Sequence, residues 1–159
     1  MKRATAIFSL LMGALCVAPA ATIEARHTHG VFYPGLEDQA VLQLKVVGTP
    51  GEKIKELKFS LGESTTKGKI KVAKLSSSGN RNCFTLHTQN PVQEKAATKS
   101  VKESFSFKTD IELSDKPLYL WLSYDIAPTV KRNAKVDALC TEVKMADGST
   151  VEPQVVMAE

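Results

Sequence analysis

The sequence predicts an all-β domain, an antiparallel β-sandwich of about seven to nine strands. Apolar and polar residues alternate with a period of two along most of the chain, and turn-forming residues interrupt this alternation at intervals that suit short strands. No window of about eleven residues or more has the apolar spacing of an amphipathic helix. The polar stretch VQEKAATKSVK comes nearest to it, and we expect at most one helical turn there, around Gln93 to Ala97.

Residues 1–21 have the three parts of a secretory signal. In order, these parts are the positive Lys2 and Arg3, the apolar run over 6–17 and the small residues 18–20. We expect export, with cleavage after Ala20 or alternatively Ala21, followed by a flexible lead-in over 22–30 and one domain over 31–156. The apolar run is shorter than the roughly 20 residues that span a bilayer, so no stable membrane span is expected. The destination can be the periplasm, the cell surface or the medium.

The composition argues against nucleic acid as a partner. Once Lys2 and Arg3 are removed, nineteen basic and seventeen acidic side chains remain. Binding to a phosphate backbone needs a concentrated positive field, which so small an excess does not supply. A remaining chain of about 138 residues can form one modest core but not a large catalytic architecture.

Four segments before residue 115 alternate as half-buried strands do. They are AVLQLKVV (40–47), KELKFSLG (55–62), KGKIKVAKL (67–75) and ESFSFKTDIEL (103–113). Their predicted core faces are Leu42, Leu44 and Val46; Leu57, Phe59 and Leu61; Ile70 and Val72; and Phe105 and Phe107. Turn residues stand at 49–51, 62, 78–80, 90–91, 115–117 and 147–148.

The stretch LYLWLSYDIAP, residues 118–128, predicts the central strand of the sandwich. One face carries Leu118, Leu120, Leu122 and Tyr124, and the other carries Tyr119, Trp121, Ser123 and Asp125. A strand that is apolar on one side and largely aromatic on the other is more typical of a core than of an open ligand platform.

Two cysteines follow the signal, Cys83 and Cys140. In an oxidising compartment they can form one disulfide, which would close a long loop and stabilise the fold by roughly 2 to 4 kcal/mol. The alternative is that both are small buried hydrophobic residues. Neither belongs to a CxxC pair or has a metal-like cluster of ligands around it.

The histidines offer no catalytic machinery. His27 and His29 could face one metal ion from an extended segment, but no third ligand is evident and an exposed tail explains them more simply. His87 lies on an expected strand, and no serine or cysteine nucleophile can be paired with any histidine from this pattern. No cofactor or metal site is therefore predicted.

Asp125 and a lysine stripe are the remaining candidates for ligand contact. Asp125 follows an apolar strand, where it either ends the strand through a local Asx-type turn or contributes to binding. Lys67, Lys69 and Lys71 share one face of a predicted strand. They either attract acidic glycans or protect an exposed sheet edge from pairing with another chain.

The segment LYLWLSYDIAPTVKRNAKVDALCTEVKMADG resembles the closing motif of the N-terminal domain that precedes the propeller of bacterial BNR-repeat sialidases. The residues that carry this resemblance are Trp121, Asp125, Val136, Asp137, Cys140 and Thr141. The segments FYPGLEDQAVLQLKVVG and LKFSLGESTTKGKIKVAKLSSSGNRNCF are similar to the opening and middle of that domain, so the resemblance extends over about Val31 to Val156.

The resemblance implies a β-sandwich that accompanies a sialidase propeller without being the hydrolase. The catalytic parts of a sialidase are not matched: residues 146–150 depart from the Asp-box pattern, and only Arg26, Arg81 and Arg132 could supply an arginine cluster. Three hypotheses follow. The chain is a non-catalytic module that binds glycans or a sialidase-type partner protein, one part of a split exo-α-sialidase that needs a separate propeller, or a structural assembly protein.

Overall fold

The computed structural model describes residues 21–28, 32–65, 69–84, 90–96, 103–131 and 134–157. These residues form ten strands: β1 (Thr22–His27), β2 (Gln39–Val47), β3 (Lys53–Ser60), β4 (Ile70–Gly79), β5 (Asn90–Ala96), β6 (Ser104–Glu112), β7 (Leu118–Ile126), β8 (Leu139–Met145), β9 (Thr150–Val151) and β10 (Gln154–Val155). Helix is absent from the described ranges, and with it any helix able to cross a membrane.

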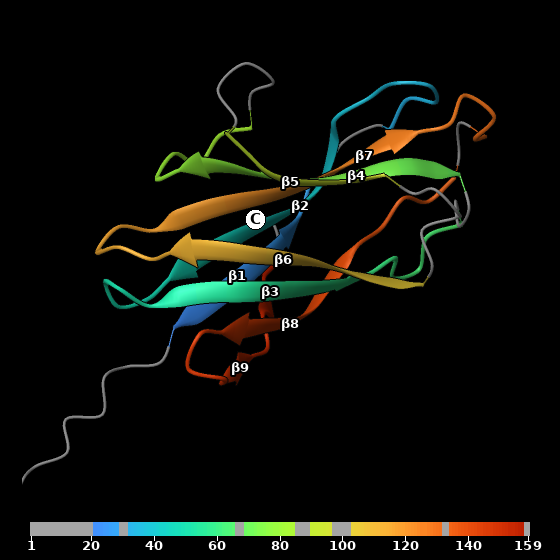
Figure 1. Cartoon of the computed structure of the whole chain (residues 1–159). Coiled ribbons are helices and arrows are strands. Elements are labelled where there is room, and N and C mark those ends of the chain that lie inside the picture. The colour runs from blue at the N-terminus through green and yellow to red at the C-terminus, as the bar shows by residue number, and fades with distance from the viewer. Residues whose placement is uncertain are drawn as a thin grey trace, which may run out of the picture.

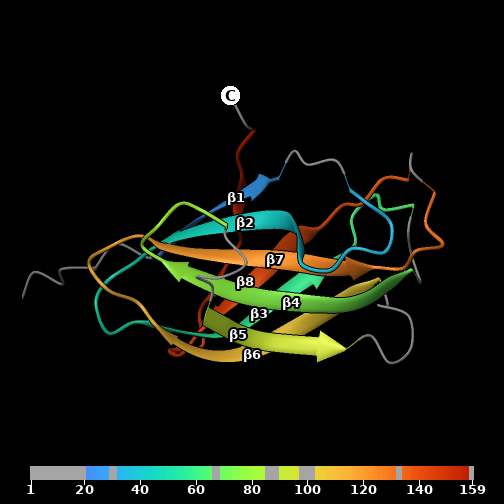
Figure 2. The same ribbon diagram turned by 90° about the horizontal axis from the view of Figure 1, so that it is seen from above.

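The strands form two layers that face each other (Figure 1). Sheet A has the order β10-β1-β2-β7-β4-β5, and sheet B has the order β6-β3-β8-β9. Figure 2 shows β1, β2, β7, β4 and β5 of sheet A side by side in this order. Every pair is antiparallel except β1 with β10. The predicted antiparallel β-sandwich is confirmed.

Strand β7 lies between β2 and β4 in the middle of sheet A, as predicted. Leu120, Leu122 and Tyr124 point into the core and are at most 1% exposed. Trp121 lies on the opposite face of the sheet, yet it is only 6% exposed because Phe84 covers it at a ring-centroid distance of 5.5 Å. The indole Nε1–H also donates to Ser78 Oγ at 2.8 Å. Trp121 is therefore a buried structural residue and not an open platform.

Aromatic rings join the two sheets inside the core. Phe105 of β6 stacks on Phe59 of β3 with centroids 5.7 Å apart, and it meets Tyr124 of β7 edge-on at 6.4 Å. Phe107 contacts both phenylalanines edge-on at 5.8 Å. Aromatic pairs of this kind add roughly 0.5 to 1.5 kcal/mol beyond the burial of their area. The alternation predicted for the β3 and β6 segments thus holds.

Two segments that were expected to be irregular are strands. A flexible lead-in was expected over residues 22–30. Within it, Thr22–His27 instead form β1, which pairs with β2 and buries Ile23 and Ala25. The helical turn expected around Gln93 is wrong, because Asn90–Ala96 forms β5 and pairs with β4. Pairing to an existing sheet satisfies backbone donors and acceptors that a single helical turn leaves open.

The core face of β4 also differs from the predicted alternation. A bulge between Ile70 and Val72 shifts the register against β7, so the buried residues are Ile70, Ala73 and Leu75. Val72 is only partly buried. An extra residue in one strand of a pair changes which side chains face inward from that point onward, and the sequence pattern did not signal it.

One end of the sandwich gathers three connections that are distant in sequence. Their described residues follow β1 (28 and 32–38), β3 (61–65 and 69) and β7 (127–131 and 134–138). Backbone hydrogen bonds tie them together: Gly35 N donates to Ile126 O at 3.0 Å, and Thr65 N donates to Lys135 O at 2.9 Å. We call this the loop end. Loops on a rigid sandwich are common positions for binding residues.

Candidate functional site

A pocket of about 350 Å³ opens at the loop end. Its lining residues are His27, Thr28, Phe32, Val41, Lys135, Val136 and Asp137. They come from the end of β1, the connection after it, the start of β2 and the connection before β8. The volume lies at the small end of the roughly 300 to 1,000 Å³ typical of ligand pockets, and the lining combines apolar walls with a few polar groups, as such pockets do.

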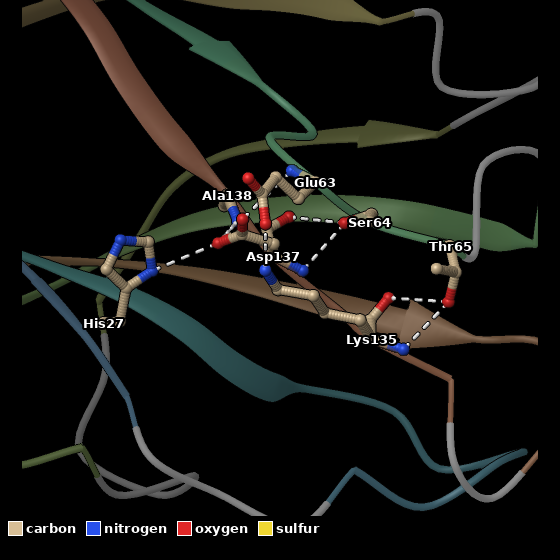
Figure 3. Close-up of polar contacts among 7 residues, drawn as sticks. All are labelled: His27, Glu63, Ser64, Thr65, Lys135, Asp137 and Ala138. Atoms are coloured by element: carbon tan, nitrogen blue, oxygen red, sulfur yellow. Dashed lines mark hydrogen bonds and ion pairs between the residues drawn. The ribbon is translucent and has the colours of Figure 1, made fainter.

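Asp137 is the best-anchored polar residue of this pocket (Figure 3). Its Oδ2 accepts from Glu63 N at 3.0 Å, and its Oδ1 accepts from Ala138 N at 2.9 Å. Its backbone N and O exchange hydrogen bonds with the Ser64 hydroxyl at 2.7 and 2.8 Å. Gly62, at φ +52°, leaves the room, since a Cβ there would lie 2.6 Å from Asp137 Oδ2. The carboxylate is thereby fixed in one orientation.

His27 completes the polar side of the pocket. Its Nδ1 lies 3.2 Å from Asp137 Oδ1, so the imidazole of β1 is oriented by a carboxylate from the connection before β8. Lys135 forms an ion pair with Glu63 at the rim. Lys135 Nζ also donates a hydrogen bond to Glu63 within this pair, and this bond is the main reason that the pKa of Lys135 is raised. The pocket thus presents an imidazole, a carboxylate and an ammonium group, and the ammonium group is paired with Glu63.

This arrangement suits hydrogen bonding better than nucleophilic chemistry. A serine triad needs a hydroxyl that donates to the histidine. Here the Ser64 hydroxyl is engaged with the backbone of Asp137, and the Thr28 hydroxyl donates to Ala40 O at 2.5 Å. Tyr124, beneath the loop end, is buried with no hydrogen-bond partner for its hydroxyl among the described atoms, and burial followed by the charge of Asp137 raises its pKa.

Asp125 proves to be a loop anchor. It is 7% exposed, its Oδ1 accepts from Asp38 N at 2.9 Å, and its Oδ2 lies 3.1 Å from Lys74 Nζ. The local Asx-type turn is therefore not what the structure has, because the acceptor serves a residue 87 positions away in sequence. Lys74 also lies 3.0 Å from Asp38 Oδ1. Burial acts to lower the pKa of Lys74, but its hydrogen bonds to the two carboxylates, together with their charges, raise it overall.

The lysine stripe is not assembled as expected. Lys67 lies outside the described residues, and Lys69 precedes β4. Lys71 is exposed on β4, but this strand lies between β7 and β5. An interior strand has no free edge to protect, so the edge-protection interpretation is wrong for β4. The described lysines of this stripe do not reach the pocket at the loop end.

Both cysteines are free in the structure. Cys140 faces the core from β8, where burial raises the pKa of its thiol to about 12. Cys83 is exposed in the segment after β4, next to Phe84, which covers the outer face of sheet A at Trp121. Sheet A therefore separates the two thiols. The alternative, in which both cysteines are small buried hydrophobic residues, therefore holds for Cys140 but not for Cys83.

The histidines are divided by the structure. His27 belongs to the pocket, while His29 and His87 lie outside the described residues. Within the described part of the chain, no group of three or more histidine, cysteine or acidic side chains could hold a metal ion. The sequence pattern singled out His27 as a metal ligand or a tail residue, whereas its structural partner is Asp137.

The loop over residues 32–38 was not among the candidate binding elements predicted from the sequence. Tyr33 and Leu36 are exposed there by 56% and 54%. The available signal was an aromatic pair followed by Pro34-Gly35, a turn pattern next to large apolar residues.

Comparisons with known proteins show the fold but not the function. No family model matches the sequence, and no curated protein does. A solved structure described as "Hadza microbial sialidase Hz136" is similar, with a TM-score of 0.63 and 14% sequence identity. The similarity covers 83% of this chain and 30% of that chain. The chain thus spans less than a third of that sialidase, and at this identity the likeness concerns the fold alone.

Proposed function

We propose that this chain is an exported, non-catalytic β-sandwich module related to the domains that accompany sialidases, and that it binds glycans at the loop end. The observation that carries the proposal is the extent of the fold match. It takes in 83% of this chain but 30% of a sialidase chain, as expected for one accessory part of a larger enzyme. Sialidases act on glycans, so a glycan is the natural ligand for a separate relative of such a part.

The loop-end pocket supports a hydroxyl-rich ligand. His27, Lys135 and Thr28 offer donors and acceptors at its rim, while Phe32, Val41 and Val136 supply apolar walls. A sugar ring combines hydroxyl groups with apolar C–H faces and therefore matches both kinds of lining.

A glycan array probed with the purified chain tests the proposal. The chain is produced from Ala21, and the array carries sialylated, sulfated and neutral mucin-type glycans. Binding of a defined subset supports the module, and no binding at high micromolar protein contradicts it. In parallel, a fluorogenic sialoside is incubated with the chain alone, and we expect no hydrolysis. Turnover by the isolated chain would instead identify a catalytic protein.

A matched pair of substitutions locates the site. Val136→Phe places a ring in the pocket without removing any of its polar groups. Val47→Phe makes the same change at an exposed position at the opposite end of β2. We expect Val136→Phe to abolish array binding and Val47→Phe to leave it unchanged. Equal binding by both variants would remove the pocket from the proposal.

A further inference from the structure

The loop that precedes β2 carries an exposed aromatic side chain on a firmly held backbone. Tyr33 and Leu36 are two of the five large hydrophobic residues that are exposed among the described ones, and only three positions separate them. Phe32, directly before Tyr33, lines the pocket. Tyr33 therefore directly follows a pocket residue in sequence.

Two sets of hydrogen bonds hold this loop in place. Gln39 Oε1 accepts from Tyr33 N at 2.6 Å, and Gln39 Nε2 donates to Tyr33 O at 2.9 Å and to Leu36 O at 3.1 Å. The end of β7 adds a second set, because Ile126 O accepts from Gly35 N at 3.0 Å and Ile126 N donates to Leu36 O at 3.2 Å. The Gln39 side chain therefore spans the loop and β7 fixes its outer turn.

The loop is also kept in a strained conformation by two charged side chains from sheet A. Asp38 has φ +53°, the only positive value at a described non-glycine residue. Left-handed backbone at such a residue costs free energy and persists when its surroundings enforce it. Asp125 and Lys74 supply that enforcement, since they bind the backbone N and the carboxylate of Asp38. Residues in such conformations cluster at ligand clamps and other functional sites.

The size of the exposed patch indicates what it contacts. A stable protein partner needs roughly 800 Å² on each side of the interface. Two large apolar side chains on one loop fall well short of this, and sheet B turns a face of cross-strand ion pairs toward solvent, such as Lys55 with Asp110. A single aromatic face does match the C–H face of one sugar ring, and a tyrosine adds a hydroxyl for hydrogen bonding.

We propose that Tyr33 is a second contact for the glycan, stacking on a sugar ring next to the one in the pocket, and that Lys74 and Asp125 are positioning residues for it. This inference rests on the proposed function, because it assigns a further subsite to the same ligand. It accounts for an ion pair between the part-buried Lys74 and the buried Asp125 on the outer face of sheet A, which has no part in the pocket. It also makes the rigid backbone of the loop useful, since less conformational freedom of the backbone is then lost on binding.

The binding test uses 3′-sialyllactose and lactose as probes in titration calorimetry with the chain produced from Ala21. Tyr33→Ala is expected to weaken binding roughly tenfold, whereas Tyr33→Phe, which keeps the ring, is expected to stay within about threefold of wild type. Unchanged affinity of Tyr33→Ala, with the wild type binding a probe, overturns the inference and leaves the proposed function standing. If the wild type binds neither probe, the Tyr33 variants are compared with it on the glycan array instead, and an array without any binding contradicts glycan recognition itself and overturns both.

The positioning role has a readout that does not depend on a ligand. Lys74→Met removes the ammonium group, and Lys144→Met makes the same change at an exposed position of β8. We expect the backbone amide of Asp38 to lose hydrogen-exchange protection in Lys74→Met alone, while amides of the core strand β3 keep theirs. Undiminished protection at Asp38 in a folded Lys74→Met variant overturns the positioning role. If Lys74→Met does not fold, Lys74→Gln replaces it, because its amide also lacks the charge but can still donate to one carboxylate, and the same loss of protection at Asp38 is expected.

Discussion

Replacing Asp125 by alanine separates an anchoring role from a surface role. In the native structure its carboxylate accepts from the backbone of Asp38 and contacts Lys74, and the residue is only 7% exposed. The substitution leaves the Asp38 N–H without its acceptor and takes one of two carboxylates from the ammonium group. We therefore expect a loss of stability that is unusual for a carboxylate at the end of a strand.

The magnitude follows from these two contacts. An unsatisfied buried donor costs about 1 to 3 kcal/mol. Breaking a fully buried ion pair costs about 3 to 5 kcal/mol, but Lys74 keeps Asp38 as a partner at 3.0 Å, so only part of that applies. We expect Asp125→Ala to lower the free energy of unfolding by about 2 to 4 kcal/mol. Asp125→Asn retains an acceptor for Asp38 N and should lose about 1 to 2 kcal/mol.

Urea unfolding followed by the fluorescence of Trp121, which is buried beside Phe84, measures both changes. Asp110→Ala is the matched control, because Asp110 also pairs with a lysine, yet its side chain is 63% exposed. We expect the control to unfold like the wild type. Wild-type stability of Asp125→Ala would refute the anchoring role, and equal losses for Asp125→Ala and Asp110→Ala would show that burial does not decide the effect.

Three further predictions concern the scaffold. Trp121→Ala removes the contact with Phe84 and the hydrogen bond to Ser78 and should cost about 3 to 5 kcal/mol in urea unfolding; a well-folded variant that has lost ligand binding would identify Trp121 as a contact instead. In a chain from Ala21, a thiol reagent should label one cysteine, Cys83, in the native state and both in urea, whereas labelling of neither without reductant would reveal a disulfide. Burial raises the pKa of Cys140 from 9.0 to about 12, so the native state keeps a proton that the unfolded state loses. Its contribution to stability is full below pH 9 and declines as pH rises toward 12, and Cys140→Ala should flatten that part of the wild-type curve.

The strands of the core were predictable because their periodicity depends on local sequence alone. In a sandwich each strand has one face toward the core, so the alternation of Leu57, Phe59 and Leu61 is sufficient to orient β3. Strand β1 alternates as well, with Ile23 and Ala25 inward, but its position directly after a signal-like segment favoured a flexible tail. The polar sequence of β5 shows no comparable alternation, so only its pairing with β4 in the structure reveals that it is a strand.

The loop end was less predictable because its contacts connect distant segments. Asp137, in the connection after β7, contacts His27 at the end of β1 and Glu63 in the connection after β3. Asp125 contacts Asp38, which lies 87 positions away in sequence. No periodicity reports such pairs. The sequence indicated that Asp125 is an unusual acidic residue, but its role as a loop anchor depends on its hydrogen bond with Asp38, which only the structure shows.

A residue-resolved NMR titration of the chain from Ala21 with 3′-sialyllactose tests glycan binding at the loop end most directly. We predict saturable shifts confined to the amides of the pocket and its loop, with Thr28, Tyr33 and Lys135 among the largest. Strands β3, β6 and β8 should stay unchanged over most of their length. Shifts that fail to saturate, or that map to the charged outer face of sheet B, would contradict the account.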